Sequence, residues 1–172
     1  RIKELQLNDT ILDNVRDVFL ISCYTGLRIS DMMALLKRSN HVIFEEDGVK
    51  YFQLKQLKTT NSVIIPLNSI VNAILDKRNG SLPNYLHSTI INEHIKSICK
   101  RAKIIENHSL TRTIGGKVEE FNLPKYKLVS SHTARRSFCT NAFKSGIPIQ
   151  DIMAISGHKS ERVLDRKSTR LN

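Results

Sequence analysis

A β-rich stretch over residues 41–66 interrupts an otherwise helical pattern, and it most constrains what this chain can fold into. Three short runs of β-branched and aromatic residues occupy the stretch, at 42–44, 51–54 and 63–65. Turn-forming residues separate them, first Asp47-Gly48 and then 59–61. Such runs joined by short polar turns are typical of β-hairpins. The sequence therefore predicts a small three-stranded antiparallel sheet within this stretch.

Most of the remaining sequence has apolar residues at helical spacing, with residues that favour helix N-termini in front of them. The expected helix starts lie at Asn8 or Asp9, at Ser30-Asp31, at Asn68 or Ser69, at Ser88, near His132 and at Ile149. Glycines, a proline and scattered charges over 108–128 predict an exposed hairpin or loop. The predicted fold class is mainly α with one small three-stranded antiparallel sheet, an α+β arrangement.

Composition points to a basic protein of one domain. The chain carries 27 Lys and Arg against 16 Asp and Glu, a formal net charge of +11 over 172 residues. That charge favours a polyanionic partner, nucleic acid before a membrane surface. The three cysteines are odd in number and sit among apolar neighbours, so we expect reduced thiols and a cytoplasmic location. No spacing fits a zinc site and no apolar run is long enough to span a bilayer.

The run 130–136 and the later His158 carry the most chemistry. If the run begins a helix, His132 and Arg135 stand three residues apart and share a face. Gly157-His158 offers a second imidazole to the same place. Two histidines and a fixed cation suit an anionic oxygen that changes charge during a reaction, as in a phosphodiester. Arg136 is expected to face the core or the backbone.

Four motifs then appear in a recognisable order. They are Thr25-Gly26-Leu27-Arg28, Leu57-Lys58-Thr59-Thr60 ahead of Ile64-Ile65-Pro66-Leu67, Ser131-His132-Thr133-Ala134-Arg135-Arg136, and Gly157-His158-Lys159-Ser160. In this order the chain resembles the catalytic domain of the tyrosine recombinases, the phage-type integrase family, with the character of integrases of mobile elements. The resemblance covers roughly residues 7–162. It implies a recombinase catalytic domain over 1–163, incomplete at its C-terminus, and a non-family tail over 164–172 that is disordered or foreign.

The resemblance implies a cleavage reaction without cofactor or metal. In this family a tyrosine hydroxyl attacks a DNA phosphodiester and forms a 3′-phosphotyrosyl intermediate. Arg28 and Arg135 match the two cations that stabilise charge on the non-bridging oxygens. Lys58 matches the lysine that protonates the departing 5′-oxygen, with Lys55 as a near rival.

The two histidines and a carboxylate complete the implied site. His132 matches the first histidine, which hydrogen-bonds the phosphate and assists proton transfer from the nucleophile. His158 matches the second histidine position, another phosphate contact. Asp31 falls where the family often has a carboxylate near the first arginine, and we expect it to orient Arg28.

The nucleophile is missing from the expected place. The family's tyrosine lies about eight to ten residues beyond the second histidine, whereas the tyrosines here are all upstream: Tyr24, Tyr51, Tyr85 and Tyr126. Tyr24 is expected to belong to the core. A truncated or chimeric end and a degenerate, inactive paralogue both explain the absence. The chain as written is therefore expected to bind DNA weakly and to form no covalent intermediate.

Rival functions remain open at this point. Residues 141–158 have a helix–glycine–helix character that also fits a non-enzymatic helix-turn-helix DNA-binding module. A type IB topoisomerase shares the chemistry. The expected partner is double-stranded DNA, with a homo-oligomer on DNA in the full-length protein, a nucleoid-associated cytoplasmic location, and neither membrane nor small-molecule substrate. Target sequence, reaction direction and carrying element are not encoded in any motif found.

Overall fold

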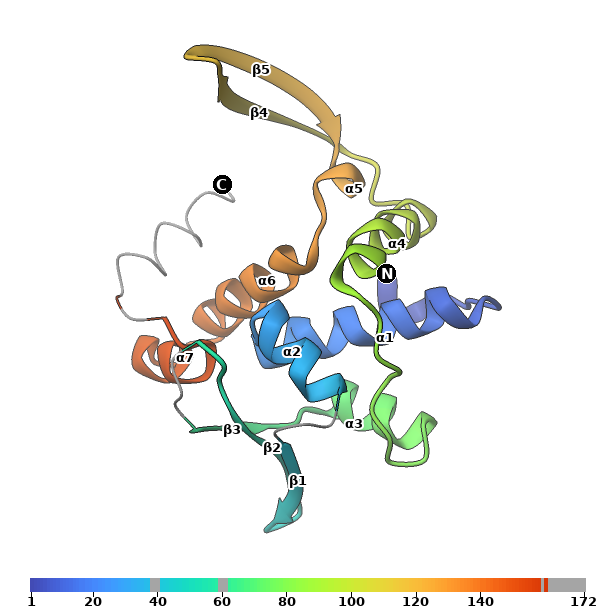
Figure 1. Cartoon of the computed structure of the whole chain (residues 1–172), viewed down its shortest axis with the longest axis vertical. Helices are drawn as coiled ribbons and strands as arrows, with labels where there is room; N and C mark the ends of the chain where they lie inside the picture. Colours follow the sequence, from blue (N-terminus) through green and yellow to red (C-terminus); the bar gives the residue numbers. More distant parts are fainter. Residues whose placement is uncertain (38–40, 59–61, 159, 161–172) are drawn as a thin grey trace.

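The structure, a computed structural model, describes residues 1–37, 41–58, 62–158 and 160. Figure 1 shows helices gathered around one central helix, with a hairpin projecting at either end of the molecule. The helices are η1 (Ile2–Glu4), α1 (Thr10–Thr25), α2 (Ile29–Leu36), α3 (Ser69–Lys77), α4 (Ser88–Arg101), α5 (Lys125–Leu128), α6 (Ser131–Lys144) and α7 (Ile149–Ser156). The strands are β1 (His41–Glu46), β2 (Val49–Lys55), β3 (Ser62–Pro66), β4 (Asn107–Ile114) and β5 (Lys117–Pro124).

The central helix is α1, which packs against α3, α4 and α6. Asp9 caps its start, because its Oδ1 accepts hydrogen bonds from the backbone N–H groups of Ile11 and Leu12. Along its length Val15 and Ile21 are fully buried. The predicted helix start is confirmed, with Asp9 as the cap. Burial on several sides fits the run of apolar residues from Val18 to Ile21 in the second half of the helix.

The predicted three-stranded sheet is confirmed, in the order β1-β2-β3 with both pairings antiparallel. In β2, Phe52 and Leu54 are buried while Gln53 and Lys55 are exposed, which is the alternation of a strand with one covered face. Phe52 pairs with Ile65 of β3, which is also buried. This register places the end of β2 and the start of β3 beside α7, which packs on β3.

The predicted exposed hairpin over 108–128 is also confirmed. Strands β4 and β5 pair antiparallel across the turn Gly115-Gly116. Figure 1 shows this hairpin extending away from the helices above α5, and Val118 near its tip is 71% exposed. The hairpin therefore adds surface to the molecule and little to its core.

Two predicted helix starts need correction. Helix α2 begins at Ile29 with Arg28 as its cap residue, so Ser30 and Asp31 lie inside its first turn. The reason is that the Asp31 carboxylate is used elsewhere, as described below. Helix α4 has His87 as its cap, with the ring Nδ1 facing the N–H of Thr89, so Ser88 is already the first helical residue.

Tyr24 also differs from the prediction. It lies near the C-terminal end of α1 and is 37% exposed, so it is not a core residue. Tyr24 instead lines an apolar cavity of about 310 Å³ that β3 and α6 also border. The three cysteines are free, as expected, with Cys99 and Cys139 buried. Among the described residues, no helix combines the length and apolar character needed to cross a bilayer.

Candidate functional site

Arg28 stands where three sequence motifs meet. It follows the buried Leu27 and caps α2. Its Nη1 donates a hydrogen bond to Gln56 Oε1 at 3.0 Å, and its Nη2 donates to the carbonyl oxygen of Gly157. The side chain keeps 20% of its surface exposed. The guanidinium is thus held on one side by the protein and open to solvent on another.

Arg135 is the second guanidinium of the site and is more deeply buried, at 6% exposed. Its Nη1 donates to the carbonyl oxygen of Gly26 at 2.8 Å, and its Nη2 lies 3.4 Å from both ring nitrogens of His158. Burial, and after it the positive charge of Arg28, lowers the pKa of the Arg135 guanidinium to about 10. The two cations therefore lie close enough to repel each other, and an anion between them would relieve that repulsion.

Two glycines permit close packing around these arginines. Gly26 ends α1 with a φ of 64°, and a Cβ there would collide with the ring of Phe138 on α6. Gly157 ends α7 with a φ of 66°, and a Cβ there would collide with Gln56 Oε1 and the guanidinium of Arg28. Both positions need a left-handed backbone and no side chain. The glycines of the two motifs thus have a steric reason in this fold.

Asp31 connects Arg28 to the segment that carries Lys58. The side chain is fully buried. Its Oδ1 accepts a hydrogen bond from the backbone N–H of Leu57 at 2.9 Å, while its Oδ2 lies 3.6 Å from Arg28 Nη1. Among the described residues Oδ2 has no hydrogen-bond donor, so the nearby guanidinium balances its charge. Asp31 therefore lies beside Arg28, and its role in orienting that guanidinium stays a prediction.

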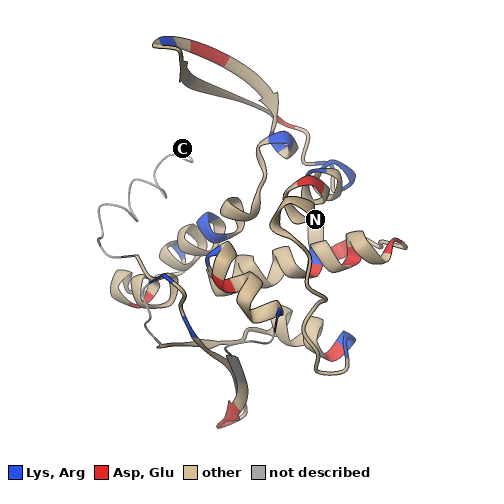
Figure 2. Cartoon of the chain, viewed as in Figure 1, with Lys and Arg blue, Asp and Glu red and all other residues tan. Residues whose placement is uncertain are grey.

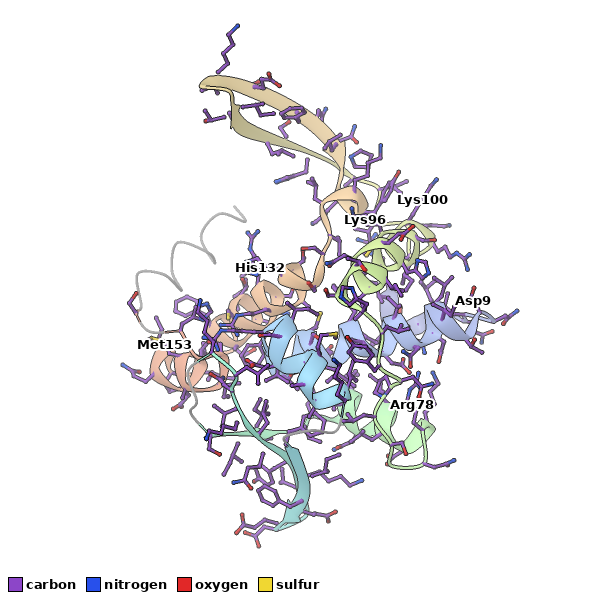
Figure 3. The ribbon with its side chains drawn as sticks, in the orientation of Figure 1. Asp9, Arg78, Lys96, Lys100, His132 and Met153 are labelled. Carbon is purple, nitrogen blue, oxygen red and sulfur yellow. The ribbon has the colours of Figure 1, made fainter. Side chains whose placement is uncertain are left out.

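The two predicted histidines occupy different environments. His158 follows the end of α7, is half-buried, and its Nδ1 lies 2.7 Å from the Oγ of Ser156, which is fully buried. His132 lies in the first turn of α6, one turn before Arg135, and is exposed (Figure 3). The structure therefore brings His158 into contact with Arg135 of α6. His132 lies on α6 as well, but at the surface of the molecule.

Lys58 and its rival Lys55 both have exposed side chains. Lys55 ends β2, whereas Lys58 lies in the following turn, next to the Leu57 N–H that Asp31 holds. Residues 59–61 of the same predicted turn lie outside the described part of the chain. The backbone link through Asp31 favours Lys58, but which lysine is used stays a prediction.

The arrangement can bind an oxyanion without a metal ion. Arg28, Arg135 and His158 meet at the junction of α2, α6 and α7, and the Asp31 carboxylate lies 3.6 Å from Arg28. Two guanidiniums suit a phosphate because each can donate two parallel hydrogen bonds. Across the described residues, no group of three or more His, Cys, Asp and Glu side chains could hold a metal ion.

Comparison with known protein families assigns the chain. The sequence model of the phage integrase family matches residues 4–169. The chain belongs to the phage integrase family. The predicted resemblance is thereby confirmed over nearly the whole length, and the match runs past residue 163, where the family-like pattern was expected to end. No curated protein matches this integrase-family chain.

Solved structures of recombinases share the fold of this integrase-family chain. XerH site-specific recombinase bound to palindromic difH substrate aligns with a TM-score of 0.63 and 15% identity, covering 98% of this chain and 45% of that chain. The Tn1549 transposon integrase in complex with transposon right end DNA gives 0.56 and 16%, covering 95% and 59%. XerA recombinase gives 0.56 and 18%, covering 95% and 55%. The integrase-family chain thus spans less than two thirds of each of these proteins.

Sequence reasoning missed one residue of the integrase-family site, Gln56. It is 1% exposed, accepts from Arg28, and its Nε2 donates to the carbonyl oxygen of Ile155 at 3.3 Å. A signal for it was present, because Phe52, Leu54 and Gln56 alternate along β2 and its continuation, all on the buried face. A polar residue at a core-facing position needs a hydrogen-bond partner. That partner turned out to be the catalytic candidate Arg28.

Proposed function

We propose that this chain binds the scissile phosphate of double-stranded DNA for site-specific recombination through a phosphotyrosyl intermediate. The observation that carries the proposal is the convergence of Arg28 and Arg135, from helices α2 and α6, on one partly open position beside His158. Family membership supports the general reaction class. The roles of individual residues, and DNA as the partner, are part of the proposal.

The proposed reaction balances without a metal or cofactor. Arg28 and Arg135 hold the two non-bridging oxygens, where negative charge grows in the transition state. A tyrosine oxygen attacks phosphorus, loses its proton with help from His132, and forms the new P–O bond. The bond from phosphorus to the 5′-oxygen breaks, and Lys58 supplies the proton to that oxygen. The products are a 3′-phosphotyrosine and a free 5′-hydroxyl.

The four tyrosines of this sequence do not fit the role of nucleophile. Tyr24 lines the apolar cavity near Phe138 and Ile147. Tyr51 pairs within the sheet and stacks on Phe44, with ring centroids 5.2 Å apart. Tyr85 precedes α4, and Tyr126 lies in α5 under Lys100. We propose that the chain as printed binds DNA but forms no covalent bond to it.

The decisive experiment supplies a tyrosine. A helix bearing a tyrosine is fused after residue 163, and the protein is incubated with a nicked duplex that traps the covalent product. We expect a DNA-linked band in a denaturing gel, lost when Arg28 or Arg135 is changed to Ala. If the fused protein binds the duplex tightly and still yields no adduct, the catalytic proposal is wrong.

The same arginine variants test the helix-turn-helix alternative. In the structure, Ile152 of α7 is fully buried and packs with Cys139 and Ala142 of α6, while Gln150, Asp151 and Ala154 of the same helix are exposed. A helix-turn-helix reader would keep its DNA affinity when Arg28 and Arg135 are changed to Ala. A phosphate-binding site at these arginines predicts weaker binding in both variants.

We also propose that a longer protein containing this chain forms a homo-oligomer on DNA. A gel-shift experiment with the fused protein tests this, because an oligomer shifts the duplex further than a single bound chain does.

A further inference from the structure

A second basic hollow adjoins α6, with a lining that contains neither Arg28 nor Arg135. It has a volume of about 500 Å³ and is bounded by α4, the start of β4, α5 and the N-terminal half of α6. Its polar lining comes from Asn92, Lys96, His108, Lys127, Ser130 and Arg136. Figure 3 shows Lys96 on α4, near the base of the β4–β5 hairpin. None of these residues belongs to the site described above.

Arg136 distinguishes this hollow from an ordinary lysine-rich surface. Successive residues of an α-helix point about 100° apart, so α6 directs Arg135 to the first site and Arg136 into the hollow. The side chain of Arg136 is half-buried, and its Nε is fully buried with no hydrogen-bond partner among the described residues. A buried donor left unpaired is costly, and a guanidinium is among the strongest donors to phosphate. The buried Nε of Arg136 is thus a strong donor that has no acceptor among the described residues.

The charge of the hollow is uncompensated. No Asp or Glu lines it, and within the part of the chain that the structure describes Lys96, Lys127 and Arg136 form no ion pair. The N-terminal end of α6 adds positive potential, because Ser130 caps the helix that starts there. Figure 2 shows Lys and Arg on α4, α5 and α6, with Asp and Glu also present on α4 and along β5; none of those acidic residues lines the hollow. The hollow thus favours an anion.

We propose that this hollow binds a backbone phosphate of the same DNA duplex, distinct from the scissile phosphate. The inference rests on the proposed function for its ligand. We assign the ligand to a duplex rather than to a small free anion, because α6 carries one arginine toward the first site and the next arginine into the hollow. Arg136 donates to the non-bridging oxygens, Lys96 and Lys127 supply further charge, and α6 positions one duplex across both sites.

The test measures how DNA binding by the full chain depends on salt. Each phosphate contact contributes about 0.9 to the slope of log K against log salt concentration. We expect Arg136→Gln and Lys96→Gln each to make the slope shallower by about that amount, with equal weakening for duplexes of different sequence. Lys144→Gln is the matched control, since it removes one charge from the exposed last turn of α6. Equal effects in Lys144→Gln would overturn the proposal.

A second readout separates this proposal from the function on which it rests. Inorganic phosphate is titrated into the labelled chain while backbone amide resonances are followed. Shifts at Asn92, Lys96 and Ser130 that disappear in Arg136→Gln support the hollow as a phosphate site even if the chain fails to bind DNA. If phosphate shifts these amides but the DNA slope is unchanged in both variants, the hollow binds free phosphate only and the DNA assignment is wrong. If neither changes, the hollow is not an anion site.

Discussion

The side-chain amide of Gln56 connects Arg28 to the end of α7. Its Oε1 accepts from Arg28 Nη1 at 3.0 Å, and its Nε2 donates to the carbonyl oxygen of Ile155 at 3.3 Å. One buried amide therefore spans the β-sheet, the first arginine and the helix that precedes His158. Such a link holds a guanidinium in one orientation, which a phosphate site requires.

Changing Gln56 separates orientation from stability. Gln56→Leu leaves Arg28 Nη1 and the Ile155 carbonyl without their partner, so we expect a loss of about 1–3 kcal/mol in the free energy of unfolding. Gln56→Glu retains an acceptor for Arg28 but adds a negative charge at the site. We therefore expect this variant to lose more free energy of DNA binding than free energy of unfolding. Urea denaturation and a DNA-binding titration measure the two effects. Equal DNA affinity in all three proteins would contradict a role for this amide.

Gly157→Ala tests the close approach of Arg28 to the end of α7. The substitution strains a φ of 66° and brings a methyl group against Gln56 and Arg28. Gly146→Ala is the control, because Gly146 has a φ of 78° but no atom within 4 Å of an added Cβ. We expect both variants to lose about 1 kcal/mol through backbone strain, and only Gly157→Ala to lose DNA affinity as well. A loss of affinity in Gly146→Ala would show that backbone strain alone accounts for the effect.

Asp31 offers a matched pair of substitutions. Asp31→Asn retains an oxygen acceptor for the N–H of Leu57. Asp31→Ala leaves that N–H unpaired, next to the space vacated by the carboxylate. We therefore expect Asp31→Ala to lower the free energy of unfolding by about 1–3 kcal/mol more than Asp31→Asn does. Thermal and urea denaturation of the two variants provide the comparison. Identical stabilities would mean that the contact to Leu57 contributes nothing.

The buried cysteines predict a defined response to high pH. Burial raises the pKa of the Cys99 thiol to about 11, and burial followed by the neighbouring Cys99 raises that of Cys23 to about 12. A thiol whose pKa is raised by folding contributes stability below its ordinary value of 9.0, and that contribution is lost as the pH rises through the folded-state pKa. Stability should therefore fall between pH 9 and 12.

Alkylation provides the measurement for these thiols. At pH 8, Cys99 should react with iodoacetamide far more slowly in the folded chain than in urea, because the thiolate is the reactive form. Mass spectrometry of the alkylated peptides reports each cysteine separately. Rapid labelling of Cys99 in the folded chain would show that the α1–α4 packing opens readily.

The sheet and the exposed hairpin were predictable because their signals are local. Runs of β-branched and aromatic residues separated by turn residues indicate the sheet, and glycines, a proline and scattered charges indicate an exposed hairpin or loop over 108–128. The starts of α2 and α4 were not, because Asp31 and Ser88 are both good cap residues by type. Which residue caps the helix depends on contacts with distant segments. For α2, the Asp31 carboxylate accepts a hydrogen bond from the Leu57 N–H instead of capping the helix. Tyr24 was misplaced for a related reason, since helical periodicity does not reveal which side of α1 lacks a covering element.

The sequence by itself determined the family, the mainly helical fold with its small sheet, and the candidates Arg28, Asp31, Arg135 and His158, because these depend on residue type, order and spacing. Only the tertiary structure decided what holds them. Residues that are 129 positions apart, Arg28 and Gly157, meet through a hydrogen bond. The buried Gln56 and the separate direction of Arg136 likewise follow from how α6 and α7 pack on the sheet and on α1. No local pattern contains that information, because it arises from packing between distant segments.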